Sequence, residues 1–388
     1  MLTKNSRLIF FAFFLLAACQ TKLPLEPRQP QVVKPAVVAP TFMPDQWATL
    51  PNWSTLDLTP SWHALQQTCH AFRFKTKWQA VCAAAAKVDE ADSTAQRAFY
   101  ESWFTPYQVY NPDGSNSGLI TGYYEPLLKG SRHKSERFCY PIYGVPEDLL
   151  EIDLADAYPP LKGLRLRGRL QGKKVVPYFN RAEIDAGETL LQGHELFWVE
   201  NAVDLFFLQI QGSGRIELED GHRAKIGYAE QNGYPYISIG KKLIDMGEIK
   251  PEDASMQTIK NWAEVNPERL FALLEQNPSY VFFREFPDTL SAPLGAMGVP
   301  LTNEYSLAVD PHTIPLGVPV FLSTTMPNST EPLNRLMYAQ DTGGAIRGAV
   351  RADFFWGFGE LAAIQAGSMK QSGRMWVLFP KGMEPTLN

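Results

Sequence analysis

The sequence predicts a mainly β protein with helical decoration. Beyond about residue 119 the apolar residues fall in short runs separated by Gly, Asp and Asn turn signals, which is typical of strands. A helical period is confined to residues 60–105 and 238–277, with one more helix at about 359–369. About 340 residues follow a proline-rich N-terminal segment, more than one ordinary core holds, so we expect two domains.

The first 18 residues are predicted to be a signal peptide. Lys4 and Arg7 precede an apolar run over residues 8–18, which is too short for the roughly 20 residues that span a bilayer. The sequence LAAC that ends at Cys19 looks like a bacterial lipobox, which implies cleavage before Cys19 and acylation of that residue. A plain cleaved signal with an incidental cysteine is the alternative.

Residues 19–51 are predicted to be a lipidated cysteine followed by a tether. Prolines recur along this segment and favour extended polyproline conformation at about 3.1 Å per residue. A merely disordered terminus is the alternative. Gln20, rather than Asp, follows the cysteine, which favours the outer membrane. We therefore expect an outer membrane lipoprotein that faces the periplasm, with the membrane as a partner through its lipid anchor.

The charge balance argues against nucleic acid as a partner. Without residues 1–18 the chain has 34 basic and 41 acidic residues, a net charge of −7. An acidic surface repels phosphate backbones. The one basic concentration, at 165–174, alternates with leucines and so predicts the solvent-facing side of a hairpin.

Three cysteines remain after Cys19. Cys69 and Cys82 lie on two consecutive helix-like stretches, and in an oxidising compartment such a pair is expected to bond. We predict a disulfide between them, with Cys139 a free, buried thiol. The spacing suits neither a zinc site nor a CxxC redox motif.

The strands are expected in two groups, with helices before and between them. The first group comprises LITGYYEPLL (119–128), KKVVPYF (173–179), LFWVE (196–200), LFFLQIQGSG (205–214) and RAKIGYA (223–229). The second comprises YVFFRE (280–285), VPVFLS (318–323), RLMYAQD (335–341), AVRADFF (349–355) and RMWVLFP (374–380). In the helical stretch between the groups, Gly247 is expected to end one helix and Asn266-Pro267 to open another.

The sequence lacks the motifs of several enzyme classes. The histidines are scattered without HxxH or HExxH spacing, and there is neither a GxSxG elbow nor a P-loop. QGSGRIEL lacks the third glycine of a dinucleotide site, and the Asp-Thr-Gly at Asp341 occurs once, whereas aspartic proteases need two such carboxylates. No metal or cofactor is expected. Carboxylates, tyrosines and amides remain, with 12% aromatic residues, and this set suits carbohydrate.

Two aspartates are the candidates for catalysis. If 349–356 is a strand, Asp353 shares a face with Arg351 and Phe355. A carboxylate among aromatic rings is desolvated, which raises its pKa above about 3.9 and lets it act as a general acid. The alternative is a structural pairing with Arg351. Asp341 precedes Thr-Gly-Gly, so a turn-forming role is its alternative.

The motifs ITGYYEP, LQIQGSGRIEL, GYAEQNGYPYISIGKKLIDMGEI, NPSYVFF and AQDTGGAIRGAVRADFFWGFG together resemble the membrane-bound lytic murein transglycosylase A family. The match runs from about 119 to 380 in unbroken order. The resemblance implies a double-psi β-barrel domain, here 52–124 plus 286–388, with a second β-domain inserted at 125–285. The substrate groove would lie between these domains.

The resemblance also implies an activity. Family members cut peptidoglycan between N-acetylmuramic acid and N-acetylglucosamine without water and leave a 1,6-anhydromuramoyl end. Asp353 matches the single catalytic acid and base, and Asp341 is assigned a supporting role in the groove. The remaining substrate-binding candidates are Thr121, Tyr124, Gln209, Gln211, Ser213, Tyr228 and Tyr236. Gln209, Gln211 and Ser213 are expected on one face of a strand, with plain solvent exposure as the alternative, and for Tyr228 and Tyr236 the alternative is a place in the core.

Two other functions remain open at this point. One is a non-catalytic peptidoglycan-binding lipoprotein on the same fold, and the other is a hydrolase of the same bond, which needs a second carboxylate. The expected partners are glycan strands and other cell-wall enzymes. The acidic segment 147–162 is extra relative to the family pattern, and its role is open.

Overall fold

The structure is a computed structural model of the 388-residue chain, and it describes residues 41–161, 164, 166–187 and 190–385. The predicted signal peptide, Cys19 and the tether up to residue 40 lie outside the described residues. The end of the predicted tether, residues 41–51, belongs to the folded body instead, because Phe42–Pro44 pair with residues 107–109 and Leu50 is buried in the core. Within the described ranges, no helix combines the length and the apolar character needed to cross a membrane.

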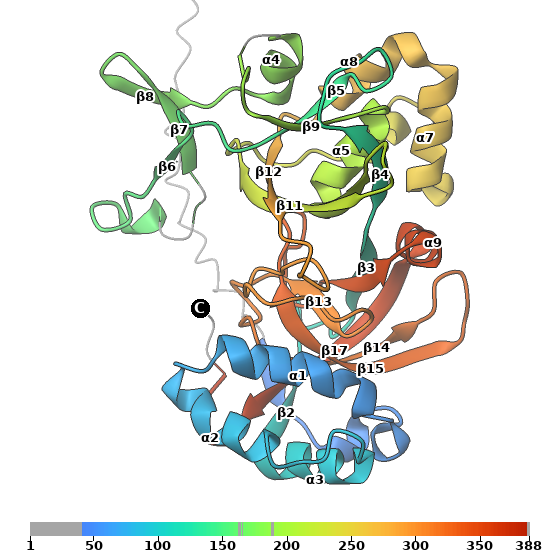
Figure 1. Cartoon of the computed structure of the whole chain (residues 1–388). Coiled ribbons are helices and arrows are strands. Elements are labelled where there is room, and N and C mark those ends of the chain that lie inside the picture. The colour runs from blue at the N-terminus through green and yellow to red at the C-terminus, as the bar shows by residue number, and fades with distance from the viewer. Residues whose placement is uncertain (1–40, 162–163, 165, 188–189, 386–388) are drawn as a thin grey trace, which may run out of the picture. The chain divides into compact units, whose positions relative to one another are not determined.

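Three helices follow a short first strand and two 3-10 turns, as the period over 60–105 predicted. They are α1 (Thr59–Ala71), α2 (Thr76–Ala85) and α3 (Ser93–Trp103) (Figure 1). Asp92 caps α3, because its side chain accepts hydrogen bonds from the N–H groups of Thr94 and Ala95. The strand β2 (Phe104–Val109) follows directly, and the sequence analysis missed it because the apolar residues of α3 continue into it without a turn signal.

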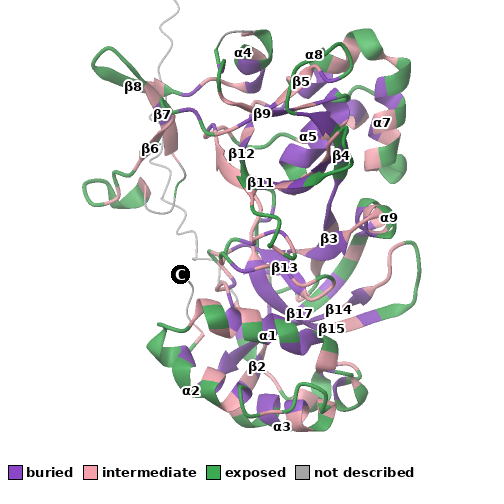
Figure 2. Cartoon of the chain, viewed as in Figure 1, coloured by how far each residue is buried: buried purple, intermediate pink, exposed green. Residues whose placement is uncertain are grey.

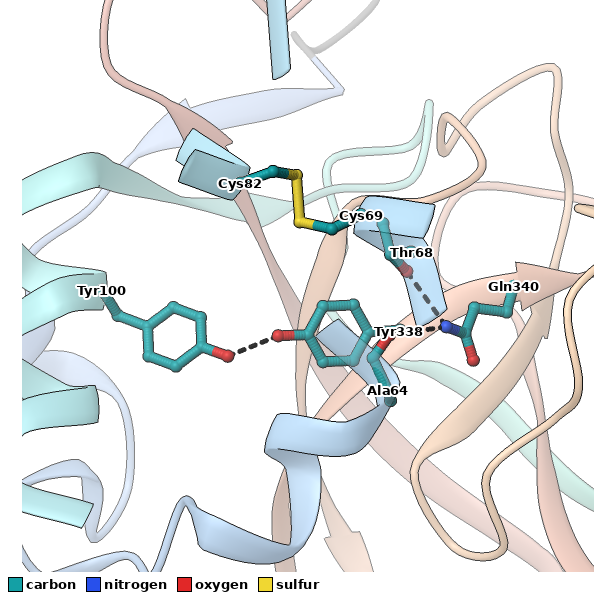
Figure 3. The surroundings of a disulfide bond; sticks show 7 residues. All are labelled: Ala64, Thr68, Cys69, Cys82, Tyr100, Tyr338 and Gln340. Carbon is teal, nitrogen blue, oxygen red and sulfur yellow. Dashed lines mark hydrogen bonds between the residues drawn. A yellow bond between two sulfur atoms is a disulfide. The ribbon is translucent and has the colours of Figure 1, made fainter. Parts of the chain in front are cut away.

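The predicted disulfide between Cys69 and Cys82 is present and joins α1 to α2 (Figure 3). Cys139 is free, as predicted, but it is half-buried rather than buried. Nearby, the buried amide nitrogen of Gln340 donates to Thr68 Oγ1 at 3.0 Å and to the carbonyl oxygen of Ala64 at 2.8 Å. The disulfide-linked helices are thus tied to the strand that holds Gln340.

Six strands close into a ring, and two more extend one side of it. The strand order is β1-β2-β17-β14-β15-β13-β16-β3, and β3 pairs with β17 as well, which closes the ring from β17 to β3. The bounds are β1 Phe42–Pro44, β2 Phe104–Val109, β3 Gly118–Glu125, β13 Ser306–Val309, β14 Pro319–Thr325, β15 Pro332–Asp341, β16 Ala352–Phe358 and β17 Lys370–Pro380. The helix α9 (Glu360–Ser368) connects β16 to β17. Figure 2 shows that the ring strands are largely buried.

A second sheet is formed by the segment between β3 and β13. Its order is β12-β11-β10-β4-β9-β5, with bounds β4 Leu127–Ser131, β5 Tyr140–Tyr143, β9 Glu195–Val199, β10 Ser213–Glu217, β11 Arg223–Gln231 and β12 Val281–Phe286. A small sheet of β6 (Leu150–Ile152), β7 (Leu166–Gln171) and β8 (Lys174–Pro177) includes the predicted hairpin. The prediction that its basic residues face solvent is wrong for Arg167, whose side chain is 7% exposed and pairs with Glu230, whereas Leu164 and Leu170 are exposed. The helices are α4 Arg181–Ala186, α5 Ala202–Gln211, α6 Ile239–Asp245, α7 Met256–Val265 and α8 Leu270–Leu274. The predicted strand-rich fold is confirmed.

The prediction of a strand over 205–214 is wrong. Residues 202–211 form α5, which Asn201 caps and which ends at Gly212, a residue with φ +79°. The run Leu205–Leu208 is buried, so its apolar pattern is continuous, and periodicity alone does not separate a buried helix from a buried strand.

The helical stretch before β12 matches the prediction with two differences. Gly247 follows α6 at φ +75°, as expected of a C-terminal glycine. Asn266-Pro267 opens a 3-10 turn that leads into α8, but the side chain of Asn266 makes no cap hydrogen bond. In α8, Leu273 and Leu274 are buried, whereas Phe271, which the helical pattern also assigns to the apolar face, is 43% exposed.

Candidate active site

Four neighbouring strands of the ring place Asp341 and Asp353 at the same position along the sheet. On β13, Ala308 lies opposite Asp341 of β15 and also opposite Asp353 of β16. Asp353 lies in turn opposite Thr121 of β3. Residues opposite one another in a sheet share a face, and neighbouring strands are about 4.8 Å apart. The Cα atoms of Asp341 and Asp353 are therefore roughly 10 Å apart, two strand spacings.

A hydroxyl group connects Asp353 to a cation. Thr121 Oγ1 donates to Asp353 Oδ1 at 2.7 Å, and Arg351 Nη2 donates to the same Thr121 oxygen at 2.9 Å. Because the guanidinium only donates, the hydroxyl proton is directed to the carboxyl group. Within the described chain Arg351 forms no direct ion pair with Asp353, so the alternative of a structural pairing between them gives way to a contact through Thr121.

The surroundings of Asp353 follow the predicted alternation. Ala352, Phe354 and Trp356 are buried in the main core of the ring. Phe355, on the same face as Asp353, belongs to a separate apolar cluster with Tyr123, and their ring centroids are 5.0 Å apart. Burial raises the pKa of Asp353, while the hydrogen bond from Thr121 and the charge of Arg351 act in the lowering direction.

Asp341 is held by three donors. Its Oδ1 accepts from the N–H groups of Ala296 at 3.0 Å and Thr342 at 2.9 Å, and its Oδ2 accepts from Tyr123 Oη at 2.9 Å. Burial raises the pKa of Asp341 to about 6, against these hydrogen bonds, and the charge of Asp353 adds to the rise. Gly295 permits the approach of the loop, since a Cβ there would meet the carbonyl oxygen of Gln340 at 2.5 Å.

A cavity of about 460 Å³ extends from Asp341. One part of its lining comes from α5, β10 and β11, and the other from the loops around 294–301 and 341–345. The predicted residues in the lining are Gln209, Gln211, Ser213, Tyr228, Tyr236 and Asp341. Thr121 and Asp353 are not in this lining but lie along the sheet from Asp341. The cavity has the size of a site for a small molecule or part of a polymer.

The comparisons with known proteins agree with this architecture. The profile described as "MltA specific insert domain" matches residues 119–284, and the profile described as "3D domain" matches residues 305–379. Membrane-bound lytic murein transglycosylase A of Escherichia coli (strain K12) is 37% identical over 279 residues, which are 70% of this chain and 68% of the relative. The chain belongs to the membrane-bound lytic murein transglycosylase A family.

Solved structures of the transglycosylase A family have the same fold. MltA from Neisseria gonorrhoeae, in its monoclinic form, is 39% identical and has a TM-score of 0.77, with 89% of this chain and 94% of that chain covered. Escherichia coli MltA with bound chitohexaose is 31% identical, with 82% and 90% covered and a TM-score of 0.63. The predicted family and its strand-rich fold with an inserted segment are confirmed, and the chain is an enzyme of the lytic transglycosylase type.

Two of the expected substrate-binding amides of this transglycosylase lie on a helix. Gln209 and Gln211 are on α5, so they do not share a strand face with Ser213, which begins β10. Gln209 is buried and accepts a hydrogen bond from Arg181, and Gln211 Oε1 accepts from the N–H of Tyr124 at 3.0 Å. All three still line the cavity, because the helix and the strand meet at Gly212.

Tyr124 is a core residue rather than a groove residue. Its side chain is 8% exposed, packs in the ring core and contacts Met256 Sδ. Burial raises its pKa to about 12. Tyr228 Oη donates to Glu230 Oε1 at 3.1 Å on β11, and Tyr236 is partly exposed in the cavity lining.

Two residues of the site were not among those predicted from the sequence. Tyr123 bonds Asp341, and the alternation of β3 could have found it, because Thr121 and Tyr123 share a face whereas Tyr124 does not. Arg181 is a buried cation in the cavity lining, and no sequence signal distinguishes it from the other arginines nearby in the sequence. No group of metal-ligating side chains gathers in the described ranges. The site residues are acids, hydroxyls, amides and arginines.

Proposed function

We propose that the chain cleaves the β-1,4 bond between N-acetylmuramic acid and N-acetylglucosamine in peptidoglycan and leaves 1,6-anhydromuramoyl ends. The observation that carries the proposal is the setting of Asp353, whose pKa is raised by burial and which accepts a hydrogen bond from Thr121. A carboxyl group whose pKa is raised keeps its proton to a higher pH than a free carboxyl group does, and it can donate that proton to a glycosidic oxygen.

The reaction proceeds in two proton transfers on one residue. Asp353 gives its proton to the glycosidic oxygen as the bond from that oxygen to C1 of the muramoyl ring breaks. The C6 hydroxyl oxygen of the same ring then bonds to C1, and its proton passes to the Asp353 carboxylate. The attack is intramolecular, so the nucleophile is already near C1 and no water is consumed. Asp353 ends protonated, ready for the next cycle.

Thr121 and Arg351 support both states of Asp353. The hydroxyl donates to the carboxylate oxygen after the first transfer, and Arg351 keeps that hydroxyl oriented. The positive charge of Arg351 favours the carboxylate, whereas burial favours the acid. Because these influences on the pKa of Asp353 oppose one another, neither the protonated nor the ionised form is strongly favoured. A residue that acts first as acid and then as base requires this balance.

The hydrolase alternative has one observation in its favour. Asp341 is a second carboxyl group two strands from Asp353, with a pKa raised to about 6. Inverting glycosidases hold their two carboxyl groups about 6.5–9.5 Å apart with a water between them. However, Asp341 accepts three hydrogen bonds from Ala296, Thr342 and Tyr123, which suits a supporting residue more than a base that activates water.

Mass spectrometry of the products separates these reactions. Purified sacculi are treated with the soluble chain that begins after Cys19, and the released muropeptides are weighed. Products one water lighter than hydrolysis products support the transglycosylase, and products with a full reducing end favour the hydrolase with Asp341 as base. Glycan binding without any release of muropeptides favours the non-catalytic lipoprotein.

The placement of the enzyme is part of the proposal. We infer that Cys19 carries the lipid anchor, that the segment from Cys19 to about residue 40 tethers the body to the outer membrane, and that the chain faces the periplasm. The division into 52–124 plus 286–388 and an inserted 125–285 remains a proposal as well. It is supported by strand membership, since β3 belongs to the ring and β4 to the second sheet.

A further inference from the structure

Arg181 is a buried cation that the proposed chemistry does not use. It begins helix α4, is 4% exposed and belongs to the lining of the cavity. Its Nε donates to the carbonyl oxygen of Asn277 at 3.1 Å. Its Nη2 donates to the carbonyl oxygen of Ser279 at 2.8 Å and to the amide oxygen of Gln209. These acceptors are neutral, so they orient the guanidinium without cancelling its charge.

Aromatic rings complete the surroundings of Arg181. Its guanidinium carbon lies 4.7 Å from the ring centroid of Phe206 and 4.9 Å from that of Tyr280. Such contacts stabilise a cation and fix the plane of the guanidinium. The group is therefore positioned before any ligand arrives.

No acidic residue in the described chain forms an ion pair with Arg181. Asp185, four residues further along α4, acts on it only at longer range, and Asp341, the acidic residue of the cavity lining, is already engaged by three donors. Nη1 of Arg181 donates to no protein atom among those described. A buried charge without a counterion is costly, and an anionic ligand would offset that cost.

We propose that Arg181, through its Nη1 side, is the subsite for the carboxylate carried by a muramoyl residue of the glycan. That carboxylate is either the free lactyl group of a strand without peptides or a carboxylate of the stem peptide. The inference rests on the proposed function, because murein is the glycan that places carboxylates beside N-acetylated sugars. Arg181 then distinguishes murein from neutral glycans. The amides of the lining contact the N-acetylated sugars, which murein and neutral chitin-type glycans have in common.

The test compares three ligands with the wild-type chain and Arg181→Gln. The ligands are glycan strands with stem peptides, strands freed of peptides by an amidase, and the neutral hexamer chitohexaose. We expect Arg181→Gln to lower kcat/KM on one class of carboxylate-bearing strand by about tenfold or more, the value of a charge-assisted hydrogen bond. The Kd for chitohexaose should stay within about twofold. A loss confined to peptide-bearing strands identifies the stem peptide, and a loss confined to peptide-free strands identifies the lactyl group.

Two control variants make the result specific. Arg137→Gln removes the same charge from an exposed ion pair with Glu200, and it should leave all three ligands unaffected. Arg284→Gln removes the other cation of the cavity lining, which is exposed. If Arg284→Gln lowers the preference for carboxylate-bearing strands over chitohexaose as much as Arg181→Gln does, the positive electrostatic potential of the whole cavity is responsible. That result would overturn the assignment to Arg181. Equal losses on chitohexaose and on charged strands overturn it as well.

The wild-type chain provides a second readout that does not depend on the variant folding. The arginine side-chain N–H signals are followed by NMR during titration with N-acetylmuramic acid and with N-acetylglucosamine. A shift of a protected, buried arginine signal with the first sugar alone supports the subsite, and equal responses to both sugars contradict it. If the wild-type chain binds but cleaves none of the strands, the proposed function fails while the ratio of Kd values still tests Arg181.

Discussion

Asp341 and Asp353 lie at the same level of the strand ring, on the two strands that flank β13, and both are opposite Ala308. Tyr123 hydrogen-bonds the first, and Thr121, two residues earlier on β3, hydrogen-bonds the second. One face of β3 therefore supplies the hydroxyl donors of both carboxyl groups. Within the described chain Asp341 accepts three hydrogen bonds and Asp353 accepts one, so Asp353 is the freer of the two to exchange a proton with a substrate.

Asp353→Asn should abolish turnover and keep glycan binding. Removal of a general acid and base lowers rates by about 10²–10⁴-fold, and here one residue performs both transfers. Release of anhydro products from sacculi and the Kd for chitohexaose give the two readouts. Glu360→Gln, an exposed carboxylate at the start of α9, is the matched control. A variant that still cuts sacculi at a near-normal rate would remove Asp353 from the mechanism.

Thr121→Val should move the pH profile of kcat. The hydrogen bond from Thr121 lowers the pKa of Asp353, so its loss raises that pKa further. The acid must be protonated for the first transfer, and the alkaline limb of the profile therefore shifts to higher pH. Thr121→Ser, which keeps the hydroxyl, should leave the limb in place. An alkaline limb that moves to lower pH in Thr121→Val contradicts the assigned hydrogen bond.

Asp341 should make stability depend on pH. Its folded pKa, about 6, exceeds its ordinary value of 3.8, so its favourable contribution is present below pH 3.8 and is lost as the pH rises through 6. Between pH 4 and 7.5, Asp341→Asn should gain stability relative to wild type by on the order of 2 kcal/mol. Denaturant unfolding at both pH values measures this, with Glu360→Gln as the reference. An unchanged difference between variant and wild type at the two pH values would show that Asp341 does not titrate in this way.

Opening of the Cys69–Cys82 disulfide should lower stability by about 2–4 kcal/mol, because the closed loop restricts the unfolded chain. Thermal melting of Cys69→Ser/Cys82→Ser, or of wild type with a reductant, measures the loss. Cys139→Ser is the control, since that thiol is free. If the double variant melts with the wild type, the helices α1 and α2 are held by their packing alone.

The sequence predicted the elements whose local pattern is periodic. The alternation over 349–356 placed Asp353 and Phe355 on the face opposite Phe354, and the turn signals located most strands. It failed at Leu205–Leu208, because a run that is buried on every side has no period. It also chose Tyr124 over Tyr123, since resemblance to a motif does not say which residue of a strand faces the site. Arg181 depends on Asn277 and Ser279, almost a hundred positions away, and local pattern does not encode such contacts.

Gln340, the residue before Asp341, is hydrogen-bonded to Thr68 of α1, and the disulfide joins the same helix to α2. Asp353 in turn receives its hydroxyl donor from a position 232 residues away along the chain. A partly folded chain thus contains both aspartates without the groups that orient them. The two carboxyl groups therefore acquire their orientation only when β15 and β16 have met the N-terminal segments α1 and β3, so the site forms late, together with the closed ring.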